Sequence, residues 1–307
     1  MLIGSDATSK SRLWAALGIV LLSLLWGYTW VVAKQALDYA PPLTLTFIRV
    51  FGGAIALFLA LKLLRQPLAI PAPRAVLLIS LCQVSGFMLL QTFSLKFGAA
   101  GKTAVLVYTM PIWTLLLAWP ILGERVRGAQ WLAVSGILTG LFLIIEPWHL
   151  ESDWLSNSCG IGAAVFWAMG TVLVKKLRRE SRVNLLSLTA WSNLIGSIPV
   201  ALIAASVDEP AVRWAPEFVL MILVLVCIST AFCWWLWTSI LDRVPAWEAS
   251  LLVLGTPVIA IISSRWVLNE AFSRYEIAGI LLIGMGLLVL SFVSWLLERR
   301  LTASRMS

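Results

Sequence analysis

Ten apolar stretches, each long enough to form a membrane-crossing helix, follow one another along the chain and constrain its fold more than any other feature. The hydrocarbon core of a bilayer is about 30 Å thick, so a helix needs roughly 20 apolar residues to cross it. Inside that core, only helices and closed barrels satisfy their own backbone hydrogen bonds. We therefore expect an all-α integral membrane protein with ten transmembrane helices. The expected spans are 13–33, 43–64, 75–95, 102–122, 128–147, 157–176, 184–206, 216–239, 247–268 and 275–297.

Composition and charge exclude several other classes of protein. Only 12% of the residues are charged and 60% are hydrophobic, whereas soluble domains have about 25% charged residues. The stretch 13–33 is longer than the apolar region of a secretory signal, so we expect it to remain in the protein. The formal charge of +8 does not indicate nucleic-acid binding, because the basic residues are dispersed between apolar stretches. The four cysteines lie within apolar stretches and show no CxxC spacing, so neither a zinc site nor a disulfide is expected.

The distribution of Lys and Arg predicts which side of the membrane each loop occupies, because cytoplasmic loops are enriched in these residues. With the N-terminus in the cytoplasm, most of the 23 basic residues fall on the cytoplasmic side, including the loop KKLRRESR at 175–182. The acidic segments EPWHLESDW (146–154) and SVDEPAV (206–212) then fall on the opposite side. An even number of spans returns the C-terminus to the cytoplasm.

The chain contains an internal repeat. The segment VYTMPIWTLLLAWPILGER (107–125) is matched by VLGTPVIAIISSRWVLNEA (253–271), with valine, proline and glutamate at a constant offset. The first and sixth spans also share a tryptophan followed at the same spacing by a lysine. Residues 1–150 and 151–307 are therefore two five-helix units. Because five is odd, the second unit enters the membrane from the opposite side, which is the inverted repeat of many secondary transporters, with a substrate site between the halves.

The order of these motifs resembles the drug/metabolite transporter superfamily, EamA type. Each half has an alanine- or glycine-rich turn, a helix with a central proline, an end such as LGE, and a glycine-rich helix, over 97–144 and 243–290. LLWG in the first span and TFIRVFGGAIAL in the second also fit, while Asn269 departs from the pattern at the position of Gly123. The resemblance covers nearly the whole chain. It implies an exporter or uptake carrier for amino acids, metabolites or drugs in a bacterial inner membrane.

Aromatic and amide side chains within the spans are the candidates for contact with a cargo. Tryptophan faces suit apolar, aromatic or cationic molecules, and the repeat-related Trp26 and Trp167, near the membrane centre, are the first choice. Packing of these rings on lipid or on neighbouring helices is the alternative, as is helix-to-helix bonding for the amides and hydroxyls. Gln83, Phe87 and Gln91 are spaced to share one helix face. The candidate substrate-binding residues are Trp26, Trp30, Gln83, Phe87, Gln91, Tyr108, Trp113, Trp167, Thr171, Trp234 and Trp237.

Three residues are candidates for hinges or gates. Pro111 and Pro257 lie in the middle of spans four and nine, where a proline removes a helix hydrogen bond and bends the span. Arg49 is a charge well inside span two, which is a functional hypothesis by default. Its place in the family pattern favours a structural or gating role over cargo contact. Glu124 and Glu270, at the ends of spans four and nine, are each expected to form a hydrogen bond with a helix start or loop of the next span.

Several absences narrow the function. No Asp or Glu lies near the middle of a span, and the one histidine, His149, is in a loop, so a proton relay is not expected. HExxH and GxSxG do not occur, so we expect no enzyme activity, no cofactor and no metal. A channel subunit would need a charged or carbonyl-lined pore, and none is evident.

The sequence thus predicts a carrier that works by alternating access through a central cavity and exports small metabolites, above all amino acids with aromatic or apolar side chains. The alternative is an efflux carrier for drugs or cationic aromatic molecules. The expected partners are a small-molecule substrate and the lipid bilayer, without nucleic acid. Two five-span halves in one chain are compatible with a working monomer.

Overall fold

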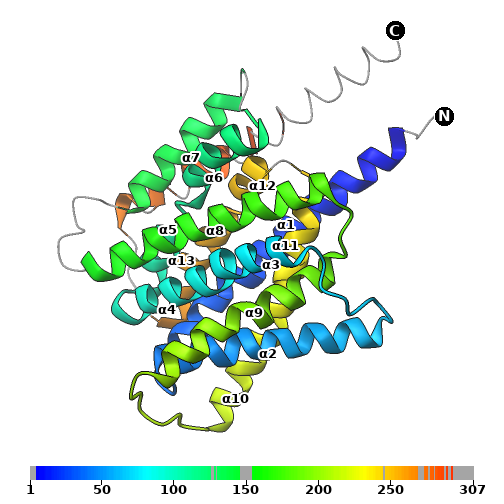
Figure 1. Ribbon diagram of the computed structural model, residues 1–307. Helices are drawn as coiled ribbons and strands as arrows, with labels where there is room; N and C mark the ends of the chain where they lie inside the picture. The colour runs from blue at the N-terminus through cyan, green and yellow to red at the C-terminus, as the bar shows by residue number, and fades with distance from the viewer. Residues whose placement is uncertain are drawn as a thin grey trace.

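The computed structural model describes residues 5–125, 128, 130–145, 154–244, 246–268, 273–275, 277–279, 281–286, 288–289 and 292, and every regular element with stated bounds among them is a helix (Figure 1). The helices are α1 (Ser5–Ala36), α2 (Pro42–Leu63), α3 (Pro73–Ile79), η1 (Ser80–Gly86), α4 (Phe87–Phe97), α5 (Ala100–Val107), α6 (Met110–Leu122), α7 (Gln130–Ile145), α8 (Trp154–Glu180), α9 (Leu185–Ala205), α10 (Pro216–Leu223), η3 (Val224–Phe232), α11 (Cys233–Leu241), α12 (Ala246–Leu252) and α13 (Gly255–Leu268).

Eight of the ten expected spans are helical segments long and apolar enough to cross a membrane. The fifth is shorter. Its apolar part, Trp131–Leu143 within α7, rises only about 20 Å at 1.5 Å per residue, against a core about 30 Å thick. The tenth span lies partly outside the described residues, and its pieces 277–279 and 281–286 belong to another short apolar helix. The chain is thus a multi-pass membrane protein with eight spans of full length among its described residues.

Spans three and eight each contain a wide, π-helical turn. In span three, η1 joins α3 to α4, and in span eight, η3 joins α10 to α11. A π turn takes one more residue than an α turn and frequently occurs at functional sites. Residues before and after a π turn that would lie on one face of a regular α-helix therefore lie on different faces.

Spans four and nine are interrupted by helix breaks, and this corrects the expectation of a simple proline bend. Span four stops at Tyr108 and Thr109, between α5 and α6, and span nine is interrupted between α12 and α13. Pro111 and Pro257 each lie in the first turn of the following helix. Proline is tolerated there because the first N–H groups of a helix have no acceptor within it.

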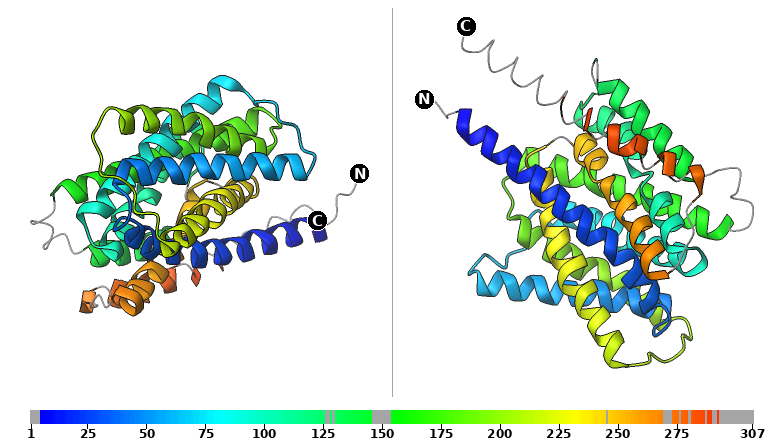
Figure 2. Two further views of the ribbon diagram at one scale, coloured as in Figure 1. Left: turned by 90° about the horizontal axis from the view of Figure 1, so that it is seen from below. Right: turned by 180° about the vertical axis from the view of Figure 1, so that it is seen from behind.

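The helices pack closely around α1 and α8. α1 contacts α13, α11 and η3, while α8 contacts α4, α5 and α6. α2 and α9 pack against each other and lie side by side in Figure 1. The two further views in Figure 2 show the long helix α1 running along the bundle. Gly27 permits the contact between α1 and α13, because a Cβ on Gly27 would lie 2.5 Å from the Cβ of Ile259.

Two lysines mark opposite ends of the bundle. The Arg243 guanidinium, which follows α11, lies 4.1 Å from the Trp14 ring centroid near the start of α1. Lys34 lies near the other end of α1, about 30 Å away at 1.5 Å per residue. Lys175 bonds the segment next to Arg243. We refer to these as the Lys34 end and the Lys175 end.

Each lysine holds together helices of its own half of the chain. The Lys34 ammonium donates to the carbonyl oxygens of Leu95 and Gly98 at the end of α4, both at 2.8 Å. Lys175 donates to two carbonyl oxygens at the end of α11, at 2.5 and 2.7 Å. The last carbonyls of a helix have no partner within it and carry partial negative charge, so a cation stabilises them. The repeated lysine therefore has the same structural role in both halves.

Candidate substrate cavity

A cavity lies inside the bundle in the half next to the Lys34 end. The space inside it that holds no protein atoms is about 440 Å³, which includes space open to solvent. Its wall comes from α1, α2, α4, α8, α11 and the break between α5 and α6. The residues that line it are Trp26, Thr29, Trp30, Ala33, Arg49, Phe87, Gln91, Val107, Tyr108, Met110, Trp167 and Trp234.

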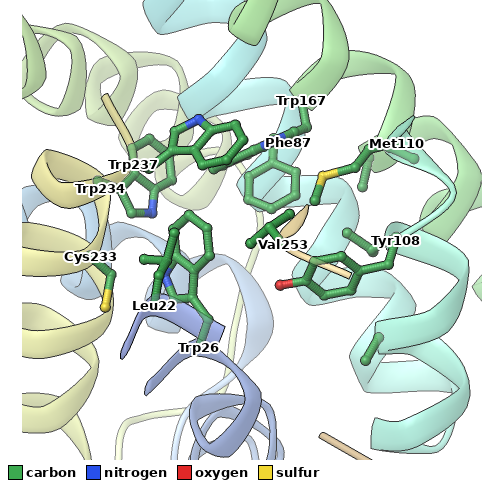
Figure 3. Packing of buried hydrophobic residues seen from close by; sticks show 14 of the residues in the cluster. Leu22, Trp26, Phe87, Tyr108, Met110, Trp167, Cys233, Trp234, Trp237 and Val253 are labelled. Carbon is green, nitrogen blue, oxygen red and sulfur yellow. The ribbon is translucent and has the colours of Figure 1, made fainter. Parts of the chain in front are cut away.

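An aromatic cluster closes one side of this cavity, with Trp167 at its centre. The Trp167 ring centroid lies 4.6 Å from that of Phe87 and 5.4 Å from that of Trp26. It lies 5.6 Å from Trp234 and 5.7 Å from Trp237. Figure 3 shows these rings gathered on one side of the open space, and the hydroxyl of Tyr108 pointing toward them from the other. Edge and tilted arrangements of this kind are the favourable ones for aromatic pairs.

Beyond the cluster, toward the Lys175 end, the bundle is filled with aliphatic side chains. Leu22 and Ile240 are fully buried, and the Leu236 side chain lies 3.4 Å from the position of a Cβ on Gly18. The aromatic cluster therefore forms the floor of the cavity. The free space lies between this floor and the Lys34 end.

Glu124 joins the two halves of the chain at the Lys175 end. Its carboxylate, at the end of α6, pairs with the Arg179 guanidinium of α8 at 2.5 Å. It also accepts a hydrogen bond at 2.9 Å from the N–H of Ala246, at the start of α12. The sequence predicts a bond from the next span, span five. The bond is instead to the helix start in span nine, and Glu270 lies outside the described residues. Because α8 and α12 lie in the second half of the sequence, Glu124 bonds the two halves to each other at this end.

Arg49 supplies a positive charge to the cavity wall. It lies on α2, and only 7% of its surface is exposed. Its Nη2 donates to the Ser229 hydroxyl at 2.9 Å and its Nε to the Thr230 hydroxyl at 3.3 Å, both in η3. The Ser229 hydroxyl in turn donates to Thr29 on α1 at 3.3 Å. The wide turn in span eight thus presents two hydroxyls to Arg49.

Trp26 is fixed by the same wide turn. Its indole N–H donates to the backbone oxygen of Ser229 at 3.0 Å. Trp30, one turn further along α1, packs with its ring centroid 6.2 Å from that of Tyr108. α1 therefore presents one continuous face to the cavity.

Seven predicted substrate-binding residues lie together on the cavity wall, and four do not line it. Trp237 lies behind the wall, packed on Trp26 and Trp167. Gln83 packs against the backbone of Gly170 in α8, and Thr171 is fully buried. The seven are Trp26, Trp30, Phe87, Gln91, Tyr108, Trp167 and Trp234, and the four are Gln83, Trp113, Thr171 and Trp237.

The predicted hinge and gate residues are divided in the same way. Arg49, expected to act in gating, lies on the cavity wall, whereas Pro111 and Pro257 do not line it. The structure places both prolines beside helix breaks, so a hinge at these positions stays a prediction.

Four lining residues were missed by the sequence analysis: Thr29, Ala33, Val107 and Met110. Thr29 and Ala33 follow Trp26 at helical spacing, so the face of α1 could have identified them. Val107 and Met110 flank the break in span four. The position of Pro111 in the sequence does not show where this break lies.

No group of three or more potential metal ligands occurs among the residues that the structure describes. The cavity combines aromatic faces, a cation and an amide. It is suited to holding a small organic molecule by stacking and hydrogen bonds.

The comparisons with known proteins agree with this architecture. The model of the EamA-like transporter family matches residues 13–146 and 154–292, which is most of the chain. The protein belongs to the EamA-like transporter family. This family corresponds to the drug/metabolite transporter resemblance seen in the sequence motifs.

Curated relatives of this EamA protein are also transporters. The Bacillus subtilis transporter YoaV is 29% identical over 90% of this chain and 96% of its own length. A probable amino-acid metabolite efflux pump of Escherichia coli K12 is 26% identical over 88% of this chain and 92% of its own. Its Salmonella typhimurium counterpart is similar to the same extent. The family and these relatives point to a transporter and away from an enzyme.

A solved crystal structure has the same fold. It superimposes with a TM-score of 0.73 over 91% of this chain and 98% of its own, at 21% sequence identity. At that identity the likeness concerns the fold alone. It supports the helical arrangement within which the cavity was found.

Proposed function

We propose that this protein exports small metabolites across a bacterial inner membrane, above all amino acids with aromatic or bulky apolar side chains. The observation that carries the proposal is the aromatic cavity, whose wall combines rings from both halves of the chain. Trp26 and Phe87 come from the first half, and Trp167 and Trp234 come from the second. Aromatic faces bind aromatic and aliphatic side chains by contact over a large area. Two relatives are named as probable amino-acid metabolite efflux pumps, which agrees with this cargo.

The proposed mechanism is alternating access between two inverted five-helix halves. The cavity lies next to the Lys34 end. Carboxylates join the halves at both ends, Glu124 at the Lys175 end and Glu209 at the Lys34 end. In the proposed orientation, with the N-terminus cytoplasmic, the Lys34 end faces outward. The conformation described here is then one in which cargo would leave to the outside. Breaking the Glu124 contacts and closing the Lys34 end would give the opposite state, with each half held together by its own lysine.

Transport in liposomes tests this function. The purified protein is reconstituted, and uptake of a panel of labelled amino acids is measured without a gradient and then with a pH gradient. We expect saturable uptake without a gradient, fastest for aromatic and bulky aliphatic amino acids, together with counterflow from preloaded vesicles. Linear, non-competitive flux would indicate a channel. Absence of amino-acid flux, with saturable uptake of a cationic aromatic dye, would support the drug-efflux alternative.

A further inference from the structure

Arg49 carries a charge that the described part of the protein does not neutralise. Its side chain donates hydrogen bonds to the neutral hydroxyls of Ser229 and Thr230, and no described salt bridge includes it. A guanidinium has five N–H groups, so further donors are available to a ligand. A charge within a membrane-spanning helix is costly and is usually paired. The cavity therefore contains a cation whose counter-ion has to come from elsewhere.

Gln91 places a hydrogen-bond acceptor beside this cation. Its side-chain oxygen is buried and has no partner among the described residues. Arg49 and Gln91 both line the main cavity and also a smaller one of about 270 Å³, and Ala33 is the third residue common to the two. The helices that carry them are joined by a hydrogen bond of 2.9 Å between the hydroxyls of Thr46 and Thr92. A cationic donor and an unpartnered acceptor thus both border the same two cavities.

We propose that Arg49 binds the α-carboxylate and Gln91 the α-ammonium group of an amino-acid cargo. This inference rests on the proposed function and specifies how its cargo is recognised. The two groups of an α-amino acid are joined through one carbon atom, so they require an adjacent donor and acceptor. Guanidinium–carboxylate bonds are charge-assisted and geometrically specific. The rings of Trp26 and Trp167 lie on the same cavity and receive the side chain.

The arrangement also predicts which molecules are rejected. An aromatic amine without a carboxylate would place its positive charge beside Arg49 and leave the guanidinium without a counter-ion. Desolvated like charges disfavour a wrong ligand strongly. A carboxylate without the amine keeps the Arg49 contact and loses only the bond to Gln91. The order of affinity is therefore amino acid, then carboxylate, then amine.

Competition in liposomes tests this order on the wild-type protein. Labelled L-phenylalanine uptake is measured against unlabelled L-phenylalanine, 3-phenylpropionate and phenethylamine. We expect phenethylamine to inhibit about a hundredfold more weakly than L-phenylalanine, with 3-phenylpropionate between them, since each charged contact changes affinity about tenfold. Inhibition by phenethylamine within about threefold of L-phenylalanine would overturn the inference and leave the transport function intact. Absence of saturable uptake of both L-phenylalanine and L-leucine would overturn the proposed cargo and this inference together.

Two sets of variants assign the contacts. Arg49→Gln should raise the half-saturating concentration of L-phenylalanine about tenfold or more and remove the preference for 3-phenylpropionate over phenethylamine, while Arg49→Lys should keep part of that preference. A folded Arg49→Gln protein with unchanged preference would contradict the assignment, because a purely structural role would not alter selectivity. If Arg49→Gln does not fold, the wild-type competition decides.

For the amide, Gln91→Leu is compared with Gln83→Leu. Gln83 is a buried amide of the same span that does not line the cavity. Gln91→Leu should weaken inhibition by L-phenylalanine and leave inhibition by 3-phenylpropionate unchanged, whereas Gln83→Leu should leave their ratio unchanged. Equal effects of the two substitutions on that ratio would show that Gln91 acts in helix packing.

Discussion

Trp167 is the residue on which the cavity most depends. It contacts four other aromatic rings and is only 2% exposed. It also stands at the floor of the cavity, where the free space ends. Its indole N–H is buried and has no partner among the described residues. Trp167 therefore combines a packing role with a face for binding.

A substitution of Trp167 that keeps an aromatic ring should weaken transport and leave the fold intact. We expect Trp167→Phe to raise the half-saturating concentration for an aromatic amino acid about tenfold, which corresponds to about 1.4 kcal/mol. Trp167→Ala should abolish saturable uptake, because it also opens the aromatic cluster. The matched control is Trp266→Phe, since Trp266 is 82% exposed on α13. Equal losses in the liposome assay for Trp167→Phe and Trp266→Phe would contradict a specific role for the cavity ring.

At the scale of helices, the spans could be predicted closely, because length and hydropathy determine them. Spans 43–64 and 184–206 agree with α2 and α9 to within a residue at each end. The wide turns η1 and η3 could not be predicted, because neither contains a proline or another local signal.

The wide turn η1 explains why one predicted helix face is divided. Gln83, Phe87 and Gln91 would share a face on a regular α-helix. Gln83 lies in η1, whereas the other two lie in α4. The extra residue of a π turn rotates the helix before the turn relative to the helix after it. Gln83 consequently faces α8, while Phe87 and Gln91 face the cavity. Sequence spacing identified these residues, but their directions depended on packing.

The contacts of Glu124 between helices should control opening of the Lys175 end. Glu124→Ala removes the pair with Arg179 and the acceptor of the buried Ala246 N–H. An unsatisfied buried donor costs about 1–3 kcal/mol. Amide hydrogen exchange over Ala246–Leu252, followed by mass spectrometry, should therefore become about tenfold faster. Glu180→Ala is the control, because that carboxylate is exposed and lies 3.9 Å from Lys176. Unchanged exchange in Glu124→Ala would show that other contacts keep this end closed.

On the scale of the whole molecule, a carboxylate bonds the two halves to each other at each end. At the Lys34 end, the Glu209 carboxylate accepts from the backbone N–H groups of Leu43 and Thr44, at the start of α2. At the Lys175 end, the Glu124 carboxylate joins α6 to the second half. Each of these carboxylates accepts from backbone N–H groups at a helix start, and Glu124 also pairs with an arginine. The lysine bonds within each half are separate from them, which is the arrangement that two rigid bodies moving past each other require.

The orientation of this assembly is open to a direct test. α9 has 21 residues and rises about 31 Å, so the loops at its two ends lie on opposite sides of a membrane. The loop before it contains Arg182, close to Arg178 and Arg179, while the loop after it contains Asp208 and Glu209. Because positive loops stay in the cytoplasm, we expect alkaline phosphatase fused after Asp208 to be active and the same enzyme fused after Arg182 to be inactive. The phosphatase folds only where its disulfides form, outside the cytoplasm. The reverse pattern of activity would invert the assignment, so that the cavity next to Lys34 would face the cytoplasm and the conformation described here would be the one that loads cargo.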